Sequence, residues 1–423
     1  MITQEIKDEI KKYFDLTPEY VGVGYGYKKT NNKITTEESI VFFVPEKKPI
    51  HDIPDDEILP SEPIVINEKV IKMDVIEIGN IRALACNSQC QQWQSTPPDN
   101  QDYTRPLKGG LSITSTNKLG FVGTLGFVAV DSETQSLVGV TNNHVVVKDP
   151  FLTSERNLNG VRENEYDIIN WGEVNPDFAY QPGESSNPPL NYHIGQVIRY
   201  VPITTTTGGI YENRVDGALI SLSGTPTLSL SESYKQFGIT SFSVPTPFAS
   251  TAEIDNLLIT NPMLKSSGRT TGVKDGSPCP LRTLYISSIL PIGGYNLQGV
   301  ETVATFVDCI VFIRPTNDPS LGSACINPIY AGDSGSALIA DLSGTNKIVG
   351  LCFAGSDYYG IANRIDNVAS ELGIEEWDGS LKNLVDTNTI TYKTIPGGNE
   401  NKLLICNSEN YWQVGLSILS NEC

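Results

Sequence analysis

The sequence predicts a mainly β protein in which a small α+β unit precedes a pair of antiparallel barrels. Glycine (37 residues) and proline (26) are plentiful in the 423-residue chain, and Val, Ile and Thr occur in short bursts, as is typical of turn-rich β structure. From Leu107 onward, short strand-like runs alternate with turn signals, which is the pattern of an all-β barrel pair. A chain of this length can hold two or three domains, each with its own core.

The N-terminal unit is predicted to contain one helix and two hairpins. Ile2, Ile6, Ile10 and Phe14 repeat at four-residue spacing and place an apolar stripe on one side of a short amphipathic helix. The strand-like runs "YVGVGYGYK" and "SIVFFV" flank the turn "KTNNK", and "EPIVI" and "VIKMDVIEIG" flank "NEK". Each set predicts a hairpin, and the unit is expected to end near residue 82.

Changes in pattern divide the chain into four parts. The polar stretch "CNSQCQQWQSTPPDNQDYTRP" is predicted to be a linker after the N-terminal unit. The predicted divisions are 1–105 for the N-terminal unit and linker, 106–225 for the first barrel, 226–385 for the second barrel and 386–423 for a C-terminal extension.

The charge balance excludes several classes of partner. With 30 Lys and Arg against 49 Asp and Glu, the net charge is -19; such a surface repels phosphate backbones, and no basic patch offsets it, so nucleic acid is not an expected partner. No run approaches the roughly 18 apolar residues of a membrane-spanning helix. The start "MITQEIKDEIKKYFDL" lacks the apolar region of a signal peptide, so we expect a cytoplasmic protein without a membrane partner.

The eight cysteines are expected to be reduced thiols in that compartment. Cys86 and Cys90 form a C-x3-C pair, but neither a second such pair nor a spare histidine lies nearby in the sequence. A thiol interpretation therefore suits them better than a metal site.

Only three histidines occur, which narrows the search for a general base. His51 lies in a polar loop and is expected to be solvated, and His193 starts a strand and is expected to be structural. His144 ends the stretch "GFVAVDSETQSLVGVTNNHVVV", in which the second of two apolar strands runs straight into "TNNH". A histidine at the end of a buried strand is held rigidly, as a general base must be.

Asp216 and Ser334 complete a candidate site. Asp216 opens the alternating strand of "NRVDGALISLS", although a strand-edge Asp that caps a turn is a common alternative. Ser334 lies in "YAGDSGSALI", where Gly332 and Gly335 permit a tight turn that would aim the amides of Gly332 and Ser334 inward as an oxyanion hole. A plain Ser/Gly hairpin turn would explain these glycines but not their coincidence with the other two residues.

The order of the three residues distinguishes among known arrangements. His144, Asp216 and Ser334 are separated by 72 (216 − 144) and 118 (334 − 216) residues. This His…Asp…Ser order is that of chymotrypsin and differs from the orders of subtilisin and the α/β-hydrolases. It predicts that Asp216 orients His144, which takes the proton of Ser334, without any metal or organic cofactor.

Together, "GTLGFVAV…TNNHVV", "VDGALISL" and "AGDSGSALI" resemble the trypsin-like serine proteases. "VGVGYGYK…SIVFFVPEKKP…MDVIEIG", "RPLKGGLSI", "KSSGRTTG" and "ANRIDNVASELGI" look more like one branch, the narrow-leaf-type peptidases of plants and their bacterial relatives. The resemblance spans residues 20–375. It implies two six-stranded antiparallel β-barrels of chymotrypsin type, with His144, Asp216 and Ser334 as the catalytic triad in the cleft between them.

The substrate preference is predicted from residues around Ser334. Pro328 stands six residues before it, where trypsin-like enzymes that select Lys or Arg carry an acid. The segment "KIVGLCFAGSDYYGIAN" looks like the two strands that wall the specificity pocket, with Gly355 and Gly360 at its mouth. Asp357 lies between them and could add a negative charge, although a solvated loop Asp is the simpler interpretation. We therefore expect an apolar or small side chain at the scissile residue.

A route of activation by cleavage is also conceivable from the sequence. Cleavage after Lys108 in "PLKGGLSI" would free an amine that could pair with Asp333. Gly109 lacks the apolar side chain that such an insertion normally buries, which disfavours this route.

Three functions compete at this stage. The leading hypothesis is a serine endopeptidase that acts on protein or peptide substrates. The second is a catalytically silent protease-fold module that binds or scaffolds partners, which the retention of all three residues disfavours. The third is a latent enzyme in a bacterial defence or signalling system, because an unrestrained intracellular protease would be harmful. Contacts with a second copy or with a regulatory protein are expected at the N-terminal unit and the C-terminal tail.

Overall fold

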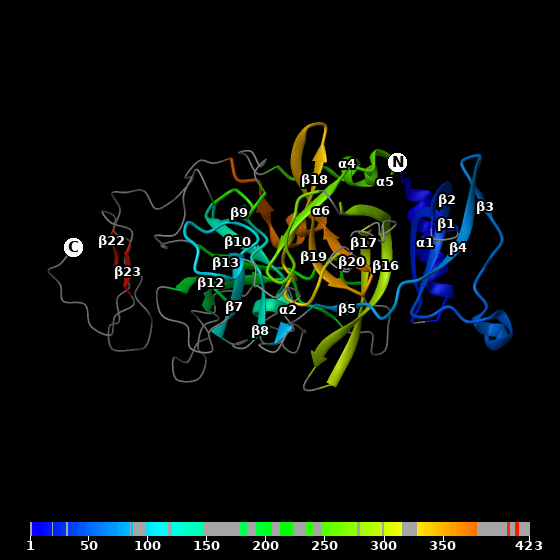
Figure 1. Cartoon of the computed structure of the whole chain (residues 1–423), viewed down its shortest axis with the longest axis horizontal. Helices are drawn as coiled ribbons and strands as arrows, with labels where there is room; N and C mark the ends of the chain where they lie inside the picture. Colours follow the sequence, from blue (N-terminus) through cyan, green and yellow to red (C-terminus); the bar gives the residue numbers. More distant parts are fainter. Residues whose placement is uncertain are drawn as a thin grey trace.

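The chain folds mainly into β structure. The computed structural model describes residues 2–18, 20–30, 33–84, 86–87, 99–116, 121–147, 178–183, 192–204, 212–222, 233–239, 247–276, 280–297, 300–314, 328–378, 404–406 and 411–413. Its strands form a twelve-stranded sheet, a nine-stranded sheet and a separate two-stranded hairpin. In Figure 1 the N-terminal unit lies at one end, the nine-stranded sheet lies toward the other, and β16 to β20 lie between them.

The N-terminal unit contains the predicted helix and both predicted hairpins. Its elements are α1 (Gln4–Leu16), β1 (Gly22–Thr30), β2 (Lys33–Val44), the 3-10 turns Ile50–Asp52 and Asp55–Glu57, β3 (Ile64–Ile66) and β4 (Lys69–Glu77). β1 pairs with β2 and β3 pairs with β4, both antiparallel, while β2 and β4 are parallel neighbours. Ile6 and Ile10 are buried against this sheet, because their four-residue spacing places them on one side of α1, and Ile2, which precedes the helix, is buried with them.

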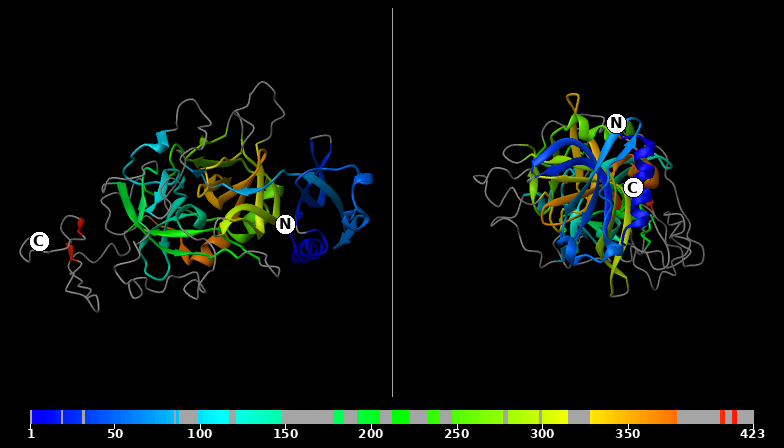
Figure 2. Two further views of the ribbon diagram at one scale, coloured as in Figure 1. Left: turned by 90° about the horizontal axis from the view of Figure 1, so that it is seen from below. Right: turned by 90° about the vertical axis from the view of Figure 1, so that its right-hand side faces the viewer.

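The N-terminal unit is continuous with the larger sheet. The other strands of this sheet are β5 (Arg82–Ala83), β14 (Leu264–Gly268), β15 (Gly272–Lys274), β16 (Arg282–Leu297), β17 (Val300–Ile313), β18 (Ala337–Leu342), β19 (Thr345–Gly355) and β20 (Tyr359–Arg364). Their order is β15-β14-β18-β19-β20-β17-β16-β1-β2-β4-β3, and β5 pairs with both β16 and β19. Because β1 pairs with β16, backbone hydrogen bonds join the N-terminal unit to the rest of the protein. Figure 2 shows the ribbon of the whole chain from two further sides.

The smaller sheet carries the part of the chain around His144. Its order is β21-β9-β10-β13-β12-β11-β7-β8-β6. The bounds of these strands are β6 (Cys86–Asn87), β7 (Ser112–Ser115), β8 (Phe121–Thr124), β9 (Phe127–Asp131), β10 (Leu137–Thr141), β11 (Phe178–Tyr180), β12 (His193–Tyr200), β13 (Ala218–Ser221) and β21 (Ile374–Glu375). Trp377, which follows β21, is fully buried in the core of this sheet.

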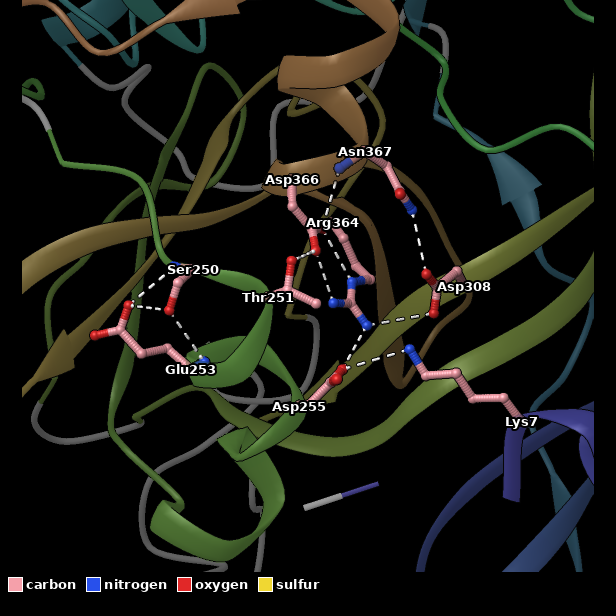
Figure 3. A network of polar contacts seen from close by, with 9 residues as sticks. All are labelled: Lys7, Ser250, Thr251, Glu253, Asp255, Asp308, Arg364, Asp366 and Asn367. Atoms are coloured by element: carbon pink, nitrogen blue, oxygen red, sulfur yellow. Dashed lines mark hydrogen bonds and ion pairs between the residues drawn. The ribbon is translucent and has the colours of Figure 1, made fainter. Parts of the chain in front are cut away.

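Short helices and a buried ion-pair network join the layers. The other helices in the described ranges are α2 (Asn143–Val146), α4 (Thr251–Asp255), α5 (Leu257–Thr260) and α6 (Ile365–Leu372), and a 3-10 turn covers Asp99–Gln101. At the start of α6, the buried Arg364 guanidinium contacts Asp255 at 2.7 Å and Asp366 at 2.8 Å, and Asp255 also contacts Lys7 of α1 at 3.7 Å (Figure 3). The network therefore links the N-terminal helix to α4 and α6.

The predicted mainly β class is confirmed, and the closure of the sheets into two six-stranded barrels stays a prediction. The predicted domain divisions also stay predictions. Of the predicted extension 386–423, the structure describes only the paired strands β22 (Leu404–Cys406) and β23 (Tyr411–Gln413). Most of the predicted linker, residues 88–98, lies outside the described residues.

Candidate active site

Strand register brings His144 and Asp216 together. β10 and β13 are antiparallel neighbours in which Thr141 lies opposite Ala218. His144 follows Thr141 by three residues, on the short helix α2, and Asp216 precedes Ala218 by two, so both lie just beyond the same end of the strand pair. Asn142 fixes this junction because its side-chain amide donates to the Asp216 carbonyl at 2.6 Å.

The Asp216 carboxylate is fully buried and accepts three hydrogen bonds. Its Oδ1 accepts from the His144 backbone N–H at 3.1 Å, and its Oδ2 lies 2.5 Å from His144 Nδ1. Oδ2 also accepts from the Tyr295 hydroxyl at 2.8 Å. Because hydrogen bonds to a buried charge are the strong ones, these partners hold the carboxylate and the imidazole in one orientation.

The His144 ring presents its other nitrogen to the interior. With Nδ1–H donating to a carboxylate, the neutral imidazole carries its lone pair on Nε2. Nε2 is buried and has no hydrogen-bond partner among the described residues. His193 Nε2 is likewise buried without a partner among the described residues; it is the bond from Nδ1 to the Asp216 carboxylate, together with the open Nε2, that suits His144 to act as a general base.

The other two histidines differ from His144 in their surroundings. The His51 side chain is 78% exposed and lies 3.6 Å from Asp52. His193 packs edge-on against the rings of Phe178 and Tyr180, and burial lowers its pKa below the ordinary value.

The Gly-Asp-Ser-Gly sequence forms a tight turn against the smaller sheet. Gly332 and Gly335 have φ of +97° and +92°, a conformation that other residues rarely adopt. A Cβ at Gly335 would lie 2.1 Å from the Thr124 carbonyl oxygen, so only glycine fits. Thr124 binds the turn from the other sheet: its N–H donates to the Ser334 carbonyl at 2.8 Å and its hydroxyl to the Gly332 carbonyl at 2.9 Å.

Ser334 lies in this turn but is not bonded to His144. Its side chain is fully buried, and its hydroxyl donates to the Phe353 carbonyl at 3.1 Å. The structure therefore joins His144 to Asp216 directly and leaves the Ser334 hydroxyl on a different acceptor. Rotation about Cα–Cβ moves the oxygen of a serine between staggered positions, and rotation about Cβ–Oγ redirects its O–H.

Asp333 anchors the turn through a buried ion pair. Its carboxylate accepts from the Thr270 and Thr271 amides at 2.8 and 3.0 Å and from the Thr271 hydroxyl at 2.6 Å. Lys274 Nζ lies 3.5 Å away, and both side chains are buried. Burial lowers the pKa of Lys274, and the Asp333 charge opposes that shift.

These contacts bear on activation by cleavage after Lys108. Asp333 already has a cationic partner in the intact chain, and the Gly109 N–H donates to the Lys235 carbonyl at 3.1 Å. A free amine at Gly109 would have to displace both sets of contacts to reach Asp333.

One proposed oxyanion donor already has an acceptor. The Gly332 N–H donates to the carbonyl of Leu84 at 3.0 Å, a residue that follows β5 in the chain. The amide is therefore aimed at a carbonyl oxygen from another segment, as an oxyanion donor has to be.

Three of the four predicted specificity residues, Gly355, Asp357 and Gly360, lie at the turn from β19 to β20. Gly355 lies opposite Gly360 where β19 turns into β20, and Pro328 is buried while Asp357 is exposed in the turn. A Cβ at Gly355 would lie 2.9 Å from Ile329 Cγ2. The Tyr359 carbonyl oxygen, at 2.8 Å, and the apolar side chains of Ile329 and Leu84 therefore surround this position, and the Asp357 carboxylate is in contact with solvent.

The structure adds residues that the sequence analysis missed. Tyr295 lies on β16, about eighty residues beyond Asp216, and its ring packs edge-on against His144 with centroids 6.1 Å apart. Burial, with the Asp216 charge beside it, raises its pKa well above the ordinary value, so the hydroxyl stays a donor. Asn363 on β20 accepts from the Asp216 N–H at 3.0 Å. A tyrosine within an apolar strand was the only sequence signal for Tyr295; Asn363 lay within two segments quoted above but was given no role, and nothing marked Lys274.

Within the described part of the chain, no group of three or more His, Cys, Asp and Glu side chains could hold a metal ion. No helix among the described residues is long and apolar enough to cross a membrane.

Comparison with known proteins gave matches in structure only. No protein-family model and no curated protein sequence matches the chain. Among solved structures, it is similar to Protease A of Thermobifida fusca, with 12% identity, a TM-score of 0.33, and coverage of 64% of this chain and 98% of that one. It is also similar to the Nocardiopsis protease, with 13% identity, a TM-score of 0.28 and the same coverage of both chains. At these TM-scores the likeness has no weight for function, which is inferred below from the geometry of the site.

Proposed function

We propose that the protein is a serine endopeptidase of the chymotrypsin type, with His144, Asp216 and Ser334 as its catalytic triad. The observation that carries the proposal is the buried His144–Asp216 hydrogen bond, with Nε2 unpaired, in a chain that places Ser334 in a glycine-flanked turn. The order of the three residues supports it. Protein or peptide substrates follow from the reaction class.

In the proposed mechanism the Ser334 hydroxyl turns from the Phe353 carbonyl toward His144 Nε2. Nε2 accepts its proton as Oγ attacks the substrate carbonyl carbon, and Asp216 stabilises the imidazolium through Nδ1–H. The imidazolium then protonates the leaving amine. A water molecule hydrolyses the acyl-enzyme by the same steps in reverse order and restores the serine.

The main electrostatic contribution is assigned to the amides of the turn. The Gly332 and Ser334 N–H groups are proposed to donate to the oxyanion, each worth about 3 kcal/mol. The Asp333–Lys274 pair supports this role because it holds the turn from behind. Because the turn is held in place, its N–H donors at Gly332 and Ser334 do not have to move during the reaction.

A fluorophosphonate probe tests the proposal, because it labels only an activated serine. We expect labelling of the wild type and its loss in Ser334→Ala and His144→Ala. Ser336→Ala is the matched control, since Ser336 is also buried two residues away and should keep the label. Equal labelling of Ser334→Ala and the wild type would exclude Ser334 as the nucleophile.

Finer assignments are part of the same proposal. Membership of the narrow-leaf-type branch, a cytoplasmic location and restraint within a bacterial defence or signalling system follow from the sequence arguments above. Contacts with a second copy or a regulatory protein belong with them.

A further inference from the structure

A short segment of the chain lies across the candidate active site. Ile81 to Leu84 leave the N-terminal unit after β4 and run between β16 and β19 as β5. Ala83 lies opposite Ala354 and Arg82 opposite Gly355 in an antiparallel ladder with β19. On its other side Arg82 lies opposite Gly293 of β16, whose N–H donates to the Ile81 carbonyl at 3.0 Å. The segment is thus an added strand, which is how many proteins bind an extended peptide.

Leu84 has both of its backbone groups bonded at the reactive residues. Its N–H donates to the Phe353 carbonyl at 3.1 Å, and its carbonyl accepts from the Gly332 N–H at 3.0 Å. The Ser334 hydroxyl donates to the same Phe353 carbonyl. The Leu84 carbonyl therefore lies on the proposed oxyanion donor, and the Leu84 N–H shares its acceptor, the Phe353 carbonyl, with the hydroxyl of the proposed nucleophile.

The side chains alternate as a bound substrate's would. Ile81 and Ala83 are buried, whereas Arg82 faces outward and pairs with Glu301 of β17 at 2.8 Å. Leu84 packs against the core that includes Ile329, and its Cδ1 lies 3.4 Å from the position of a Cβ at Gly355. An apolar side chain thus occupies the predicted specificity pocket.

The segment also crosses from one sheet to the other at this point. Arg82 and Ala83 pair with the twelve-stranded sheet, and Cys86 and Asn87 pair with β8 of the nine-stranded sheet. Leu84 therefore lies next to the point in the sequence where strand pairing changes from the larger sheet to the smaller one. Ser356 fixes the approach by donating from its hydroxyl to the Ile78 carbonyl at 2.6 Å.

We propose that this segment is the enzyme's own substrate and that the chain cleaves itself between Leu84 and Ala85. The inference rests on the proposed function and names one substrate of that site. Ser334 Oγ attacks the Leu84 carbonyl carbon, and His144 passes the hydroxyl proton to the Ala85 nitrogen as the C–N bond breaks. Water then hydrolyses the ester at Leu84, which leaves a Leu84 carboxylate and a free Ser334 hydroxyl. No other reactant is needed.

Intact-mass spectrometry of the purified full chain tests the proposal over a time course of hours. The wild type should yield chains of 84 and 339 residues (423 − 84), the second beginning at Ala85. Ser334→Ala should remain at 423 residues. The first cysteine is Cys86, so no disulfide can join the two products, and a denaturing gel separates them without reductant.

Two further variants connect the cut to the cleft. Leu84→Asp puts a charge into the apolar pocket and should slow the cut by roughly 100-fold or more. Leu59→Asp is the matched control, since Leu59 is a half-buried leucine of the N-terminal unit outside the cleft, and it should be cut like the wild type. Circular dichroism confirms that each variant is folded.

The outcomes separate this inference from the proposed function. A wild-type chain that stays uncut while Ser334 takes the fluorophosphonate label would overturn self-cleavage and leave the peptidase standing. A cut that appears equally in Ser334→Ala would assign it to another protease and also overturn it. Absence of label in every variant, including Leu84→Asp, would overturn both.

Discussion

The hydroxyl of Tyr295 offers a direct test of how the site is held together. Tyr295→Phe removes one of the three hydrogen bonds that the buried Asp216 carboxylate accepts and leaves the ring in place. A hydrogen bond to a charged group contributes about 1.5–3 kcal/mol. Because Asp216 is fully buried, water cannot replace the lost donor. We expect the free energy of unfolding to fall by about 2 kcal/mol.

Tyr285 provides the matched control on the same strand. It is a buried tyrosine of β16 whose hydroxyl has no hydrogen-bond partner among the described residues. Tyr285→Phe should therefore leave the free energy of unfolding unchanged or raise it slightly, since it removes an unsatisfied buried polar atom. Urea denaturation of the two variants, analysed with a common m-value, gives the comparison.

The same pair of variants separates positioning from packing. The Tyr295 hydroxyl bonds to Asp216 and not to substrate, so Tyr295→Phe should lower kcat for a peptide substrate by about tenfold with little change in KM. Tyr285→Phe should alter neither constant. If the two variants unfold at the same urea concentration and turn over substrate equally, the Tyr295–Asp216 bond has no role in holding the triad.

Three further substitutions, with Lys347→Met as the control for the first, test other charged and titratable groups. Lys274→Met leaves the Asp333 charge buried without its cation, so it should lower the free energy of unfolding by about 3–5 kcal/mol and abolish fluorophosphonate labelling. Lys347→Met is the control, because it breaks a partly exposed pair with Glu253; it should lower the free energy of unfolding by at most about 1 kcal/mol. Urea denaturation measures both. Arg364→Met removes the cation that contacts Asp255, Asp308 and Asp366 (Figure 3) and should also cost about 3–5 kcal/mol, with thermal unfolding as the measurement. Burial lowers the pKa of His193, so near and below pH 6.5 the unfolded chain binds more protons at this histidine than the folded chain does. The free energy of unfolding therefore falls as the pH drops through that range. His193→Gln should reduce this fall by at most about 1.4 kcal/mol per pH unit, measured by urea denaturation at pH 7.5 and 5.5.

Local patterns were sufficient to predict the N-terminal elements. The four-residue spacing of Ile2, Ile6 and Ile10 and the turns at "KTNNK" and "NEK" each depend on neighbours in the chain, so the sequence contains the whole signal. The pairing of β1 with β16 joins residues more than 250 positions apart. The residue pattern within one strand does not indicate which distant strand it will pair with in the sheet.

The candidate site divides in the same way. The three triad residues could be proposed because their types, order and glycine neighbours mark a known chemistry. Tyr295 and Lys274 could not, since a tyrosine or lysine in a strand acquires its role only from the partner that the fold supplies. The segment before Ala85 was placed at the end of a unit and the start of a linker, because its alternation of Ile81, Arg82 and Ala83 is too short to stand out.

The ladder between β1 and β16 has a consequence for the fate of the N-terminal unit. It pairs backbone to backbone, and the apolar side chains of α1 share a core with Leu258, Ile286 and Ile289; none of these contacts depends on the bond after Leu84. A chain severed there would persist as a two-chain particle with its new C-terminus still seated in the cleft. While that peptide is tethered, its effective concentration is set by chain geometry, in the millimolar range. After the cut the peptide is still covalently part of the N-terminal unit, so it stays in the cleft independently of dilution for as long as that unit remains bound to β16.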